Sequence, residues 1–368
     1  MSFLKNIIKR TILIILVMIT TNSFAQHIKT IDGKTLSSKE IDEIIVNAMA
    51  SNNLPGVSIA IINKNEIIYH KVFGVGNSKT KELVTTQDFF EGASLSKPIF
   101  AYFVMRMVEK GKIDLDKPLY QYLPHPGIAP ESQEDYKLIT ARMVLAHQTG
   151  FPNHANNQLI KLAFKPGTDF SYSGEAYQYL AAIIGMQNGI GFKEDLNKLF
   201  QKEVTQPLQM KHTTFVWNDY LDNHKVFGHD EEGNPTQNKP VAGRWNGKTF
   251  NAFSSVHSEA FEYAKFIIAM LKREGLKESS FEEMLKEHTH FKDNNPIKLE
   301  TDQTGWGLGF AQKQTKNGLM HLHTGNNHDF QAYTMFVPEQ EYGIVIFTNC
   351  GNMLPFLKTI SITLGNQF

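Results

Sequence analysis

The sequence predicts an α/β fold with two lobes, one built around a sheet and one mostly helical. Two observations lead to this prediction. Segments rich in Val and Ile, with the length of strands, occur near the start and again near the end of the chain. Between residues 95 and 300, helical apolar patterns alternate with turns. We therefore assign about 26–93 and 301–368 to an α/β lobe assembled from both termini, and about 94–300 to a mostly α-helical lobe.

Helix and strand signals can be placed along the chain in order. An amphipathic helix is expected at 37–51, where Ile41, Ile45 and Ala48 share one side behind a Ser start signal. Two strands at 57–62 and 66–73 flank a polar turn and predict a β-hairpin. Further helices are expected at 140–147, 174–186, 192–200, 258–273 and 354–364, and further strands at 305–310, 319–324, 331–337 and 343–348.

The first 25 residues have the pattern of a secretory signal peptide. An apolar run at 11–21 follows three basic residues and leads to the small residue Ala25. The run is too short for a transmembrane helix, and we expect cleavage after Ala25. The prediction is one exported domain, periplasmic or secreted, over residues 26–368, with no integral membrane segment after processing.

Charge and cysteine content narrow the functional classes. The chain has 37 basic and 37 acidic residues, and removal of the leader takes away three basic ones, which leaves a formal charge of −3. This balance argues against a nucleic-acid or membrane-surface partner. Cys350 is the only cysteine, so no internal disulfide can form. The oligomeric state is not indicated.

The run Ser94-Leu95-Ser96-Lys97 places a Ser and a Lys three residues apart at the start of an apolar, helix-patterned stretch. Both side chains are expected on one face of the first helical turn. There the helix dipole favours a developing negative charge on the hydroxyl, and a desolvated Lys with a lowered pKa can accept its proton. A Ser that caps a helix beside a solvated Lys would give the same motif. Partner residues elsewhere in the chain must therefore distinguish a catalytic pair from a helix cap.

Two further segments carry suitable partners. Tyr172 lies in a turn that leads into a helix, and His323-Thr324-Gly325-Asn326 ends a predicted strand, where Gly325 permits close approach to the backbone. Together and in order, these motifs resemble the serine β-lactamase and penicillin-recognising hydrolase superfamily, in its class C-like branch. That branch also contains D-Ala-D-Ala carboxypeptidases, D-aminopeptidases and esterases. The resemblance covers nearly the whole mature chain through companion motifs at 111–118, 145–152, 166–168, 207–213, 305–309 and 348–349.

The resemblance implies a serine β-lactamase-like fold with an antiparallel sheet, and acyl-enzyme chemistry on a small-molecule or peptide substrate without a cofactor. Ser94 matches the nucleophile, Lys97 the residue that helps deprotonate it, and Tyr172 the proton relay. Whether Lys97 or Tyr172 is the general base stays open. The oxyanion hole would use the backbone N–H groups of Ser94 and Asn326. The implied substrate-binding residues are His323, Thr324, Gly325 and Asn326.

Two departures from the family pattern bear on the substrate. Gly174 stands where the family has an Asn, so the amide that would bind Lys97 and the substrate's acylamide is absent; Glu175 or Asn326 are candidates to replace it. His323 stands where β-lactamases carry Lys, and a neutral His is a poorer counter-charge for a substrate carboxylate. We therefore expect a carboxypeptidase or esterase rather than a true β-lactamase.

Two other functional classes were weighed. A metal enzyme is suggested by His321 with His323 and by His288 with His290, but neither pair has a third ligand at suitable spacing, so no metal site is predicted. The alternative to a serine hydrolase is a catalytically weak or inactive relative that binds peptidoglycan or a protein. Loss of the family Asn favours that alternative, whereas retention of Ser94, Lys97 and Tyr172 opposes it.

Overall fold

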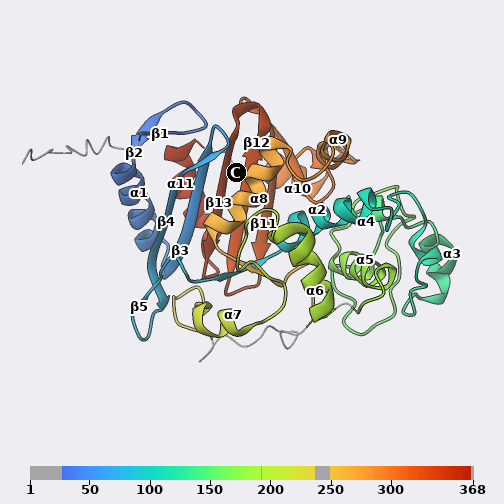
Figure 1. Ribbon diagram of the computed structural model, residues 1–368. Helices are drawn as coiled ribbons and strands as arrows, with labels where there is room; N and C mark the ends of the chain where they lie inside the picture. Colours follow the sequence, from blue (N-terminus) through green and yellow to red (C-terminus); the bar gives the residue numbers. More distant parts are fainter. Residues whose placement is uncertain (1–26, 192, 237–248, 366–368) are drawn as a thin grey trace, which may run out of the picture.

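The computed structural model describes residues 27–191, 193–236 and 249–365 (Figure 1). The predicted signal peptide at 1–25 lies outside the described residues. A nine-stranded sheet forms the centre, in the order β5-β4-β3-β13-β12-β11-β10-β9-β8, with every neighbouring pair antiparallel. Its strands come from both ends of the chain, as expected: β3 (Gly56–Asn63), β4 (Glu66–Asn77), β5 (Glu82–Leu83), β8 (Thr289–His290), β9 (Gly305–Trp306), β10 (Ala311–Thr315), β11 (Gly318–Asn326), β12 (Gln331–Val337) and β13 (Tyr342–Thr348).

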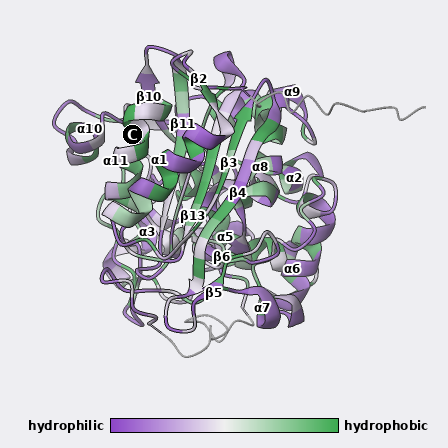
Figure 2. Ribbon diagram, turned by 90° about the vertical axis from the view of Figure 1, so that its left-hand side faces the viewer, coloured by the Kyte–Doolittle hydropathy of each residue, from purple (hydrophilic) through white to green (hydrophobic). Residues whose placement is uncertain are grey.

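Helices cover both faces of this sheet. α1 (Ser38–Ser51) and α11 (Met353–Leu364) pack together on one face, and α8 (Ala260–Lys272) packs on the other (Figure 1). Ile59 and Ile61 of β3 join the apolar cluster under α1 and α11, whereas Ala60 and Ile62 join the cluster under α8. The core strands are therefore apolar on both sides, and Figure 2 shows β3 and β13 as largely hydrophobic.

The start of α1 follows from a capping box. The backbone N–H of Glu40 donates to Ser37 Oγ at 3.2 Å, and the backbone N–H of Ser37 donates to Glu40 Oε2 at 2.7 Å. Two of the unpaired N–H groups at the helix N-terminus are thereby satisfied. A small separate ribbon of β1 (His27–Lys29) and β2 (Thr35–Ser37) leads into this cap.

The second lobe is mostly helical and is organised around α2 (Ser96–Glu109), which is buried along most of its length. It lies beside the sheet in Figure 1. Its other helices are α3 (Gln133–Tyr136), α4 (Ala141–Leu145), α5 (Gly174–Gln187), α6 (Glu194–Phe200), α7 (Asp219–His224) and α9 (Glu278–Leu285). The short helix α10 (Pro296–Thr301) lies between β8 and β9, and its Ile297 packs against the cluster under α1 and α11. The two-lobe α/β fold predicted from the sequence is confirmed.

Several boundaries differ from expectation. The strand expected at 305–310 is only β9, because the chain turns at Gly309, which has a φ of +91° and packs against Ala101, and then returns as β10. α8 begins at Ala260 rather than 258, since Val256–Ser258 forms strand β7 and pairs with β6 (Phe90–Ala93). Both α8 and β8 pack with the sheet although they lie within 94–300, so a boundary near residue 300 does not separate the lobes.

Within the described ranges, no helix combines the length and the apolar character needed to cross a membrane.

Candidate active site

Ser94 lies in the turn between β6 and α2. The helix begins at Ser96, so Ser94 precedes it instead of occupying its first turn as expected. The reason is the tight turn: Ala93 has a φ of +47°, and the backbone N–H of Lys97 donates to the Ser94 carbonyl at 3.0 Å. Ser96 holds the turn, since its Oγ donates to the Ala93 carbonyl at 2.6 Å and accepts from the Val256 N–H at 2.9 Å.

Lys97 is buried directly behind Ser94. Its Nζ lies 3.2 Å from Ser94 Oγ and 3.0 Å from the backbone carbonyl oxygen of Phe253. Burial lowers the pKa of Lys97 well below its usual value because the charged form loses its hydration. A neutral amine within reach of a hydroxyl proton is thus favoured at this position.

Tyr172 completes the group around Ser94. The Lys97 Nζ lies 4.4 Å from the centre of the Tyr172 ring, and the Tyr172 side chain is hydrogen-bonded to Ser94. Burial raises the pKa of Tyr172, and the hydrogen bond to Ser94 only partly opposes that rise, so the phenol stays protonated at neutral pH. The fold therefore brings together three residues that are far apart in sequence.

The space at Gly174, where the family pattern has an Asn, is filled by neighbouring residues. A Cβ on Gly174 would lie 2.8 Å from Phe253 Cδ2 and 2.9 Å from the Asn153 carbonyl oxygen. Neither proposed replacement bonds to Lys97: Glu175 Oε1 accepts from the Ala155 N–H at 2.8 Å, and Asn326 Oδ1 accepts from the His328 N–H at 2.7 Å. The Phe253 carbonyl holds Lys97 instead.

The end of β11 lies against the Ser94 turn. Gly325 is so close to β6 that a Cβ there would lie 2.3 Å from the Gly92 carbonyl oxygen. Glycine is thus required for the approach of the chain's own backbone, where we had expected approach of a ligand. Thr324 and Asn326 on either side are exposed.

His323 is buried and neutral. Its Nδ1 donates to the Thr324 carbonyl at 2.8 Å, and its ring lies 6.1 Å from Tyr172 and 5.5 Å from Trp306. Burial is the main cause that lowers its pKa to about 3, with the nearby Lys97 adding to the effect. His323 therefore carries no permanent positive charge, as the sequence argument assumed.

His147 belongs to the same group, although it is not among the site residues predicted from the sequence. Its ring centre lies 4.4 Å from that of Tyr172, and its Nδ1 accepts from the Ser173 N–H at 3.1 Å. Burial lowers its pKa well below the usual value, with smaller contributions from Lys97 and His323. The sequence signal that could have identified His147 is its position in the companion motif at 145–152. His147 fixes the turn that presents Tyr172.

A buried ion pair ties together the backbone around Ser94. Lys225 Nζ lies 3.0 Å from Glu91 Oε1, and Asn327 Nδ2 donates both to Glu91 Oε2 at 2.6 Å and to the Ser254 carbonyl at 3.3 Å. Burial raises the pKa of Glu91, but Lys225 and the other neighbours outweigh it and lower that pKa to about 2. The pair thereby links β6, the turn after β11 and the segment that carries Phe253. No signal in the sequence pointed to Lys225.

The histidines considered as metal ligands have other partners in the fold. His321 stacks on Phe336 at 5.0 Å, whereas His323 packs on Tyr172 and Trp306. His288 Nε2 lies 2.9 Å from the Glu283 carbonyl oxygen. In the ranges that the structure covers, no three His, Cys, Asp or Glu side chains are grouped so that they could hold a metal ion.

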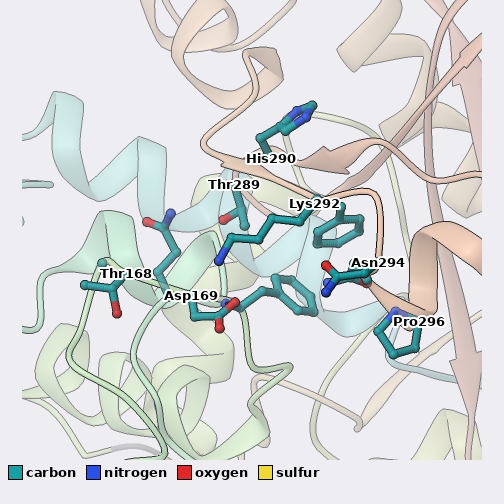
Figure 3. Close-up of a pocket in the computed structure, with 12 residues that line it drawn as sticks. Thr168, Asp169, Thr289, His290, Lys292, Asn294 and Pro296 are labelled. Carbon is teal, nitrogen blue, oxygen red and sulfur yellow. The ribbon is translucent and has the colours of Figure 1, made fainter.

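A cavity of about 430 Å³ lies one aromatic layer away from Tyr172. Phe170 lines it and packs on Trp306 at 5.4 Å, and Trp306 packs on Tyr172 at 5.9 Å. Figure 3 shows Lys292 pointing from the 289–296 segment toward the loop that carries Asp169. The volume of this cavity is that of a small-ligand pocket, but the Phe170 and Trp306 rings lie between the cavity and the Ser94 group.

The comparisons with known proteins agree with this geometry. Protein flp of Staphylococcus aureus (strain MW2) is 26% identical over 333 aligned residues, which cover 85% of this chain and 63% of that protein. The octameric penicillin-binding protein homologue from Pyrococcus abyssi has a TM-score of 0.74 and 19% identity, with 90% of this chain and 78% of that chain covered. The D-alanine carboxypeptidase AmpC from Burkholderia cenocepacia has a TM-score of 0.72 and 18% identity, with 89% and 99% covered.

These structures show a common fold, and the present chain spans 63% of the length of the Staphylococcus relative. The family model described as Beta-lactamase matches residues 41–360, most of the chain. The chain therefore belongs to the Beta-lactamase family, within the superfamily of serine β-lactamases and penicillin-recognising proteins that its sequence resembles.

Proposed function

We propose that this chain is an exported serine hydrolase that cleaves an ester or amide through an acyl-enzyme intermediate. The observation that carries the proposal is the buried Lys97 amine, 3.2 Å from Ser94 Oγ and without a carboxylate among its described contacts. An amine kept neutral by burial can accept the proton that a serine must lose when it attacks a carbonyl.

The proposed reaction has two halves. Ser94 Oγ attacks the carbonyl carbon while its proton passes to Lys97 or Tyr172, and collapse of the tetrahedral intermediate breaks the bond to the leaving group, which takes up that proton. Water then attacks the acyl ester and gives up a proton to the same pair. Collapse of the second tetrahedral intermediate releases the acid and returns that proton to Ser94 Oγ. Tyr172 suits the role of proton relay because its hydroxyl remains protonated and is hydrogen-bonded to Ser94.

We assign the oxyanion hole to the backbone N–H groups of Ser94 and Asn326. The close contact of Gly325 with Gly92 supports this assignment, because it holds the end of β11 beside the Ser94 turn. Two preorganised donors of this kind contribute several kcal/mol to the stability of a tetrahedral intermediate. His323, Thr324, Gly325 and Asn326 are proposed to line the substrate site on this side.

The substrate we propose is a small ester or a peptide with D-residues rather than a β-lactam. The neutral His323 supports this choice, because a β-lactam carboxylate would lack a cationic partner there. Export is inferred from residues 1–25; an N-terminal sequence of the mature protein that begins at Gln26 would support it, and an intact leader would contradict it.

Covalent labelling tests the mechanism. A fluorophosphonate probe should modify the wild type on Ser94, as read by peptide mass, and Ser94→Ala should lose both labelling and ester hydrolysis. Ser254→Ala, which alters a half-buried serine next to Phe253, is the matched control and should keep both. Unchanged turnover in Ser94→Ala would exclude the proposed mechanism.

A further inference from the structure

The cavity of about 430 Å³ shown in Figure 3 takes no part in the proposed reaction. The rings of Phe170 and Trp306 separate it from the Ser94 group, so an occupant would be a second ligand and not part of the substrate bound at Ser94. Cavities of this volume commonly hold small molecules. Segments distant in sequence line it: Gln148, residues 167–170, and all of 289–296 except Asp293.

Two opposite charges belong to this lining. The Lys292 side chain points toward the loop that carries the Asp169 carboxylate (Figure 3), and both residues are exposed. Among the described residues, Lys292 Nζ has no hydrogen-bond or ion-pair partner, and Asp169 accepts from the Phe170 N–H through Oδ1 at 2.8 Å. The other titratable residue of the described lining, His290, is engaged, since its Nδ1 lies 2.9 Å from Glu287 Oε1. An ammonium and a carboxylate are therefore available to an occupant.

The walls of the cavity are held by hydrogen bonds that do not involve these two charges. Thr289 Oγ1 donates to the Ala146 carbonyl at 2.8 Å, and Gln148 Nε2 donates to the carbonyl of His288 at 3.0 Å. These bonds tie the 289–296 segment to the loop that follows α4. The cavity is thus formed before a ligand arrives, which lowers the entropic cost of binding.

The chemistry of the lining matches that of a free amino acid. Its α-ammonium and α-carboxylate would each find an opposite charge, on Asp169 and on Lys292 respectively. Phe170 and Phe291, whose ring centres lie 4.8 Å apart in an edge-to-face arrangement, offer an aromatic contact for an apolar side chain. A ligand with a single charge would leave one of the two groups without a counter-charge.

We propose that this cavity binds a free amino acid with an apolar or aromatic side chain, as a zwitterion. Asp169 contacts its ammonium group and Lys292 its carboxylate. The site goes beyond the proposed hydrolase function, and its occupation requires no turnover at Ser94. Because both charges are exposed to solvent, each contributes a factor of roughly five to ten in affinity.

The test compares the dissociation constants of three ligands, measured by ligand-observed NMR titration on one preparation of the protein, so that the fraction of folded protein cancels. The ligands are phenylalanine, 3-phenylpropanoate, which lacks the ammonium, and 2-phenylethylamine, which lacks the carboxylate. Both enantiomers of phenylalanine are titrated, and the tighter one is compared with the analogues. We expect the wild type to bind phenylalanine roughly five- to tenfold more tightly than either analogue.

Two variants assign the charges. Asp169→Asn, which keeps an acceptor for the Phe170 N–H, should bind phenylalanine and 3-phenylpropanoate equally, and Lys292→Gln should bind phenylalanine and 2-phenylethylamine equally. The matched controls are Asp293→Asn and Lys298→Gln, which alter a pair at 2.8 Å on the same segment but outside the lining, and both should keep the wild-type preferences. A wild type that does not bind phenylalanine or does not prefer it, or a preference that persists in either lining variant, would overturn the proposal.

Discussion

Gly174 is the position where family resemblance and structure predict opposite outcomes. The resemblance suggests that Gly174→Asn restores a missing amide and raises activity. The structure predicts the reverse, because a Cβ at 174 would lie 2.8 Å from Phe253 Cδ2 and 2.9 Å from the Asn153 carbonyl oxygen. Such overpacking costs about 1–3 kcal/mol of folding free energy.

The chemical step should suffer as well. Phe253 is the group that can move, and its displacement shifts the carbonyl oxygen that lies 3.0 Å from Lys97 Nζ. A neutral hydrogen bond is worth about 0.5–1.5 kcal/mol, so we expect the acylation rate to fall roughly two- to tenfold. Urea unfolding gives the stability, and the rate of fluorophosphonate labelling gives the acylation rate.

The matched control is Gly191→Asn, since a Cβ at Gly191 meets no atom of the described residues within 4 Å. That variant should unfold and acylate like the wild type. If Gly174→Asn were as stable as the wild type and acylated faster, the argument from the contacts of Phe253 would be refuted.

Three other predictions follow from the site. Lys97→Arg should lose acylation, because a guanidinium stays charged and cannot accept the Ser94 proton. Burial lowers the pKa of Lys97 in the folded wild type, so over a range of pH below about 10.4 the unfolded chain binds a proton at Lys97 that the folded chain does not. The free energy of unfolding should therefore rise with pH over that range, and Lys97→Met should remove this rise. Lys225→Met should cost about 3–5 kcal/mol of stability by leaving the Glu91 carboxylate without its cationic partner, and Glu91→Gln in the same chain should recover part of it, both measured by urea unfolding. His323→Lys should raise kcat/KM for nitrocefin relative to a p-nitrophenyl ester, and a wild type that already prefers nitrocefin would contradict the weight given to His323.

The long elements could be predicted because their side chains carry the signal. β3, β12 and β13 are buried on both faces and read as apolar runs, and α1 has both the apolar stripe and the cap. Strand β10 could not be predicted, since its sequence Ala-Gln-Lys-Gln-Thr is polar. Its buried polar side chains donate to backbone carbonyls of distant segments: Gln312 Nε2 to that of Leu285 at 2.6 Å, and Lys313 Nζ to that of Thr301 at 3.0 Å.

The site divides in the same way. The sequence pointed to Ser94, Lys97 and Tyr172 through motif order, and the structure places them in contact. Phe253 could not be predicted as a site residue because it contacts Lys97 through its backbone carbonyl, which every residue type possesses. Lys225 was also out of reach, since its pairing with Glu91 depends on tertiary contacts between distant segments.

The electrostatics of the site bear on the substrate through His323, one of the two departures from the family pattern. Burial lowers the pKa values of Lys97, His147 and His323, which favours the neutral form of all three groups around Tyr172. Among the described residues, this side of the site therefore offers a substrate carboxylate only uncharged hydrogen-bond partners. A substrate with a neutral leaving group fits this side, whereas the carboxylate of a β-lactam would lose its hydration there without gaining a cationic partner.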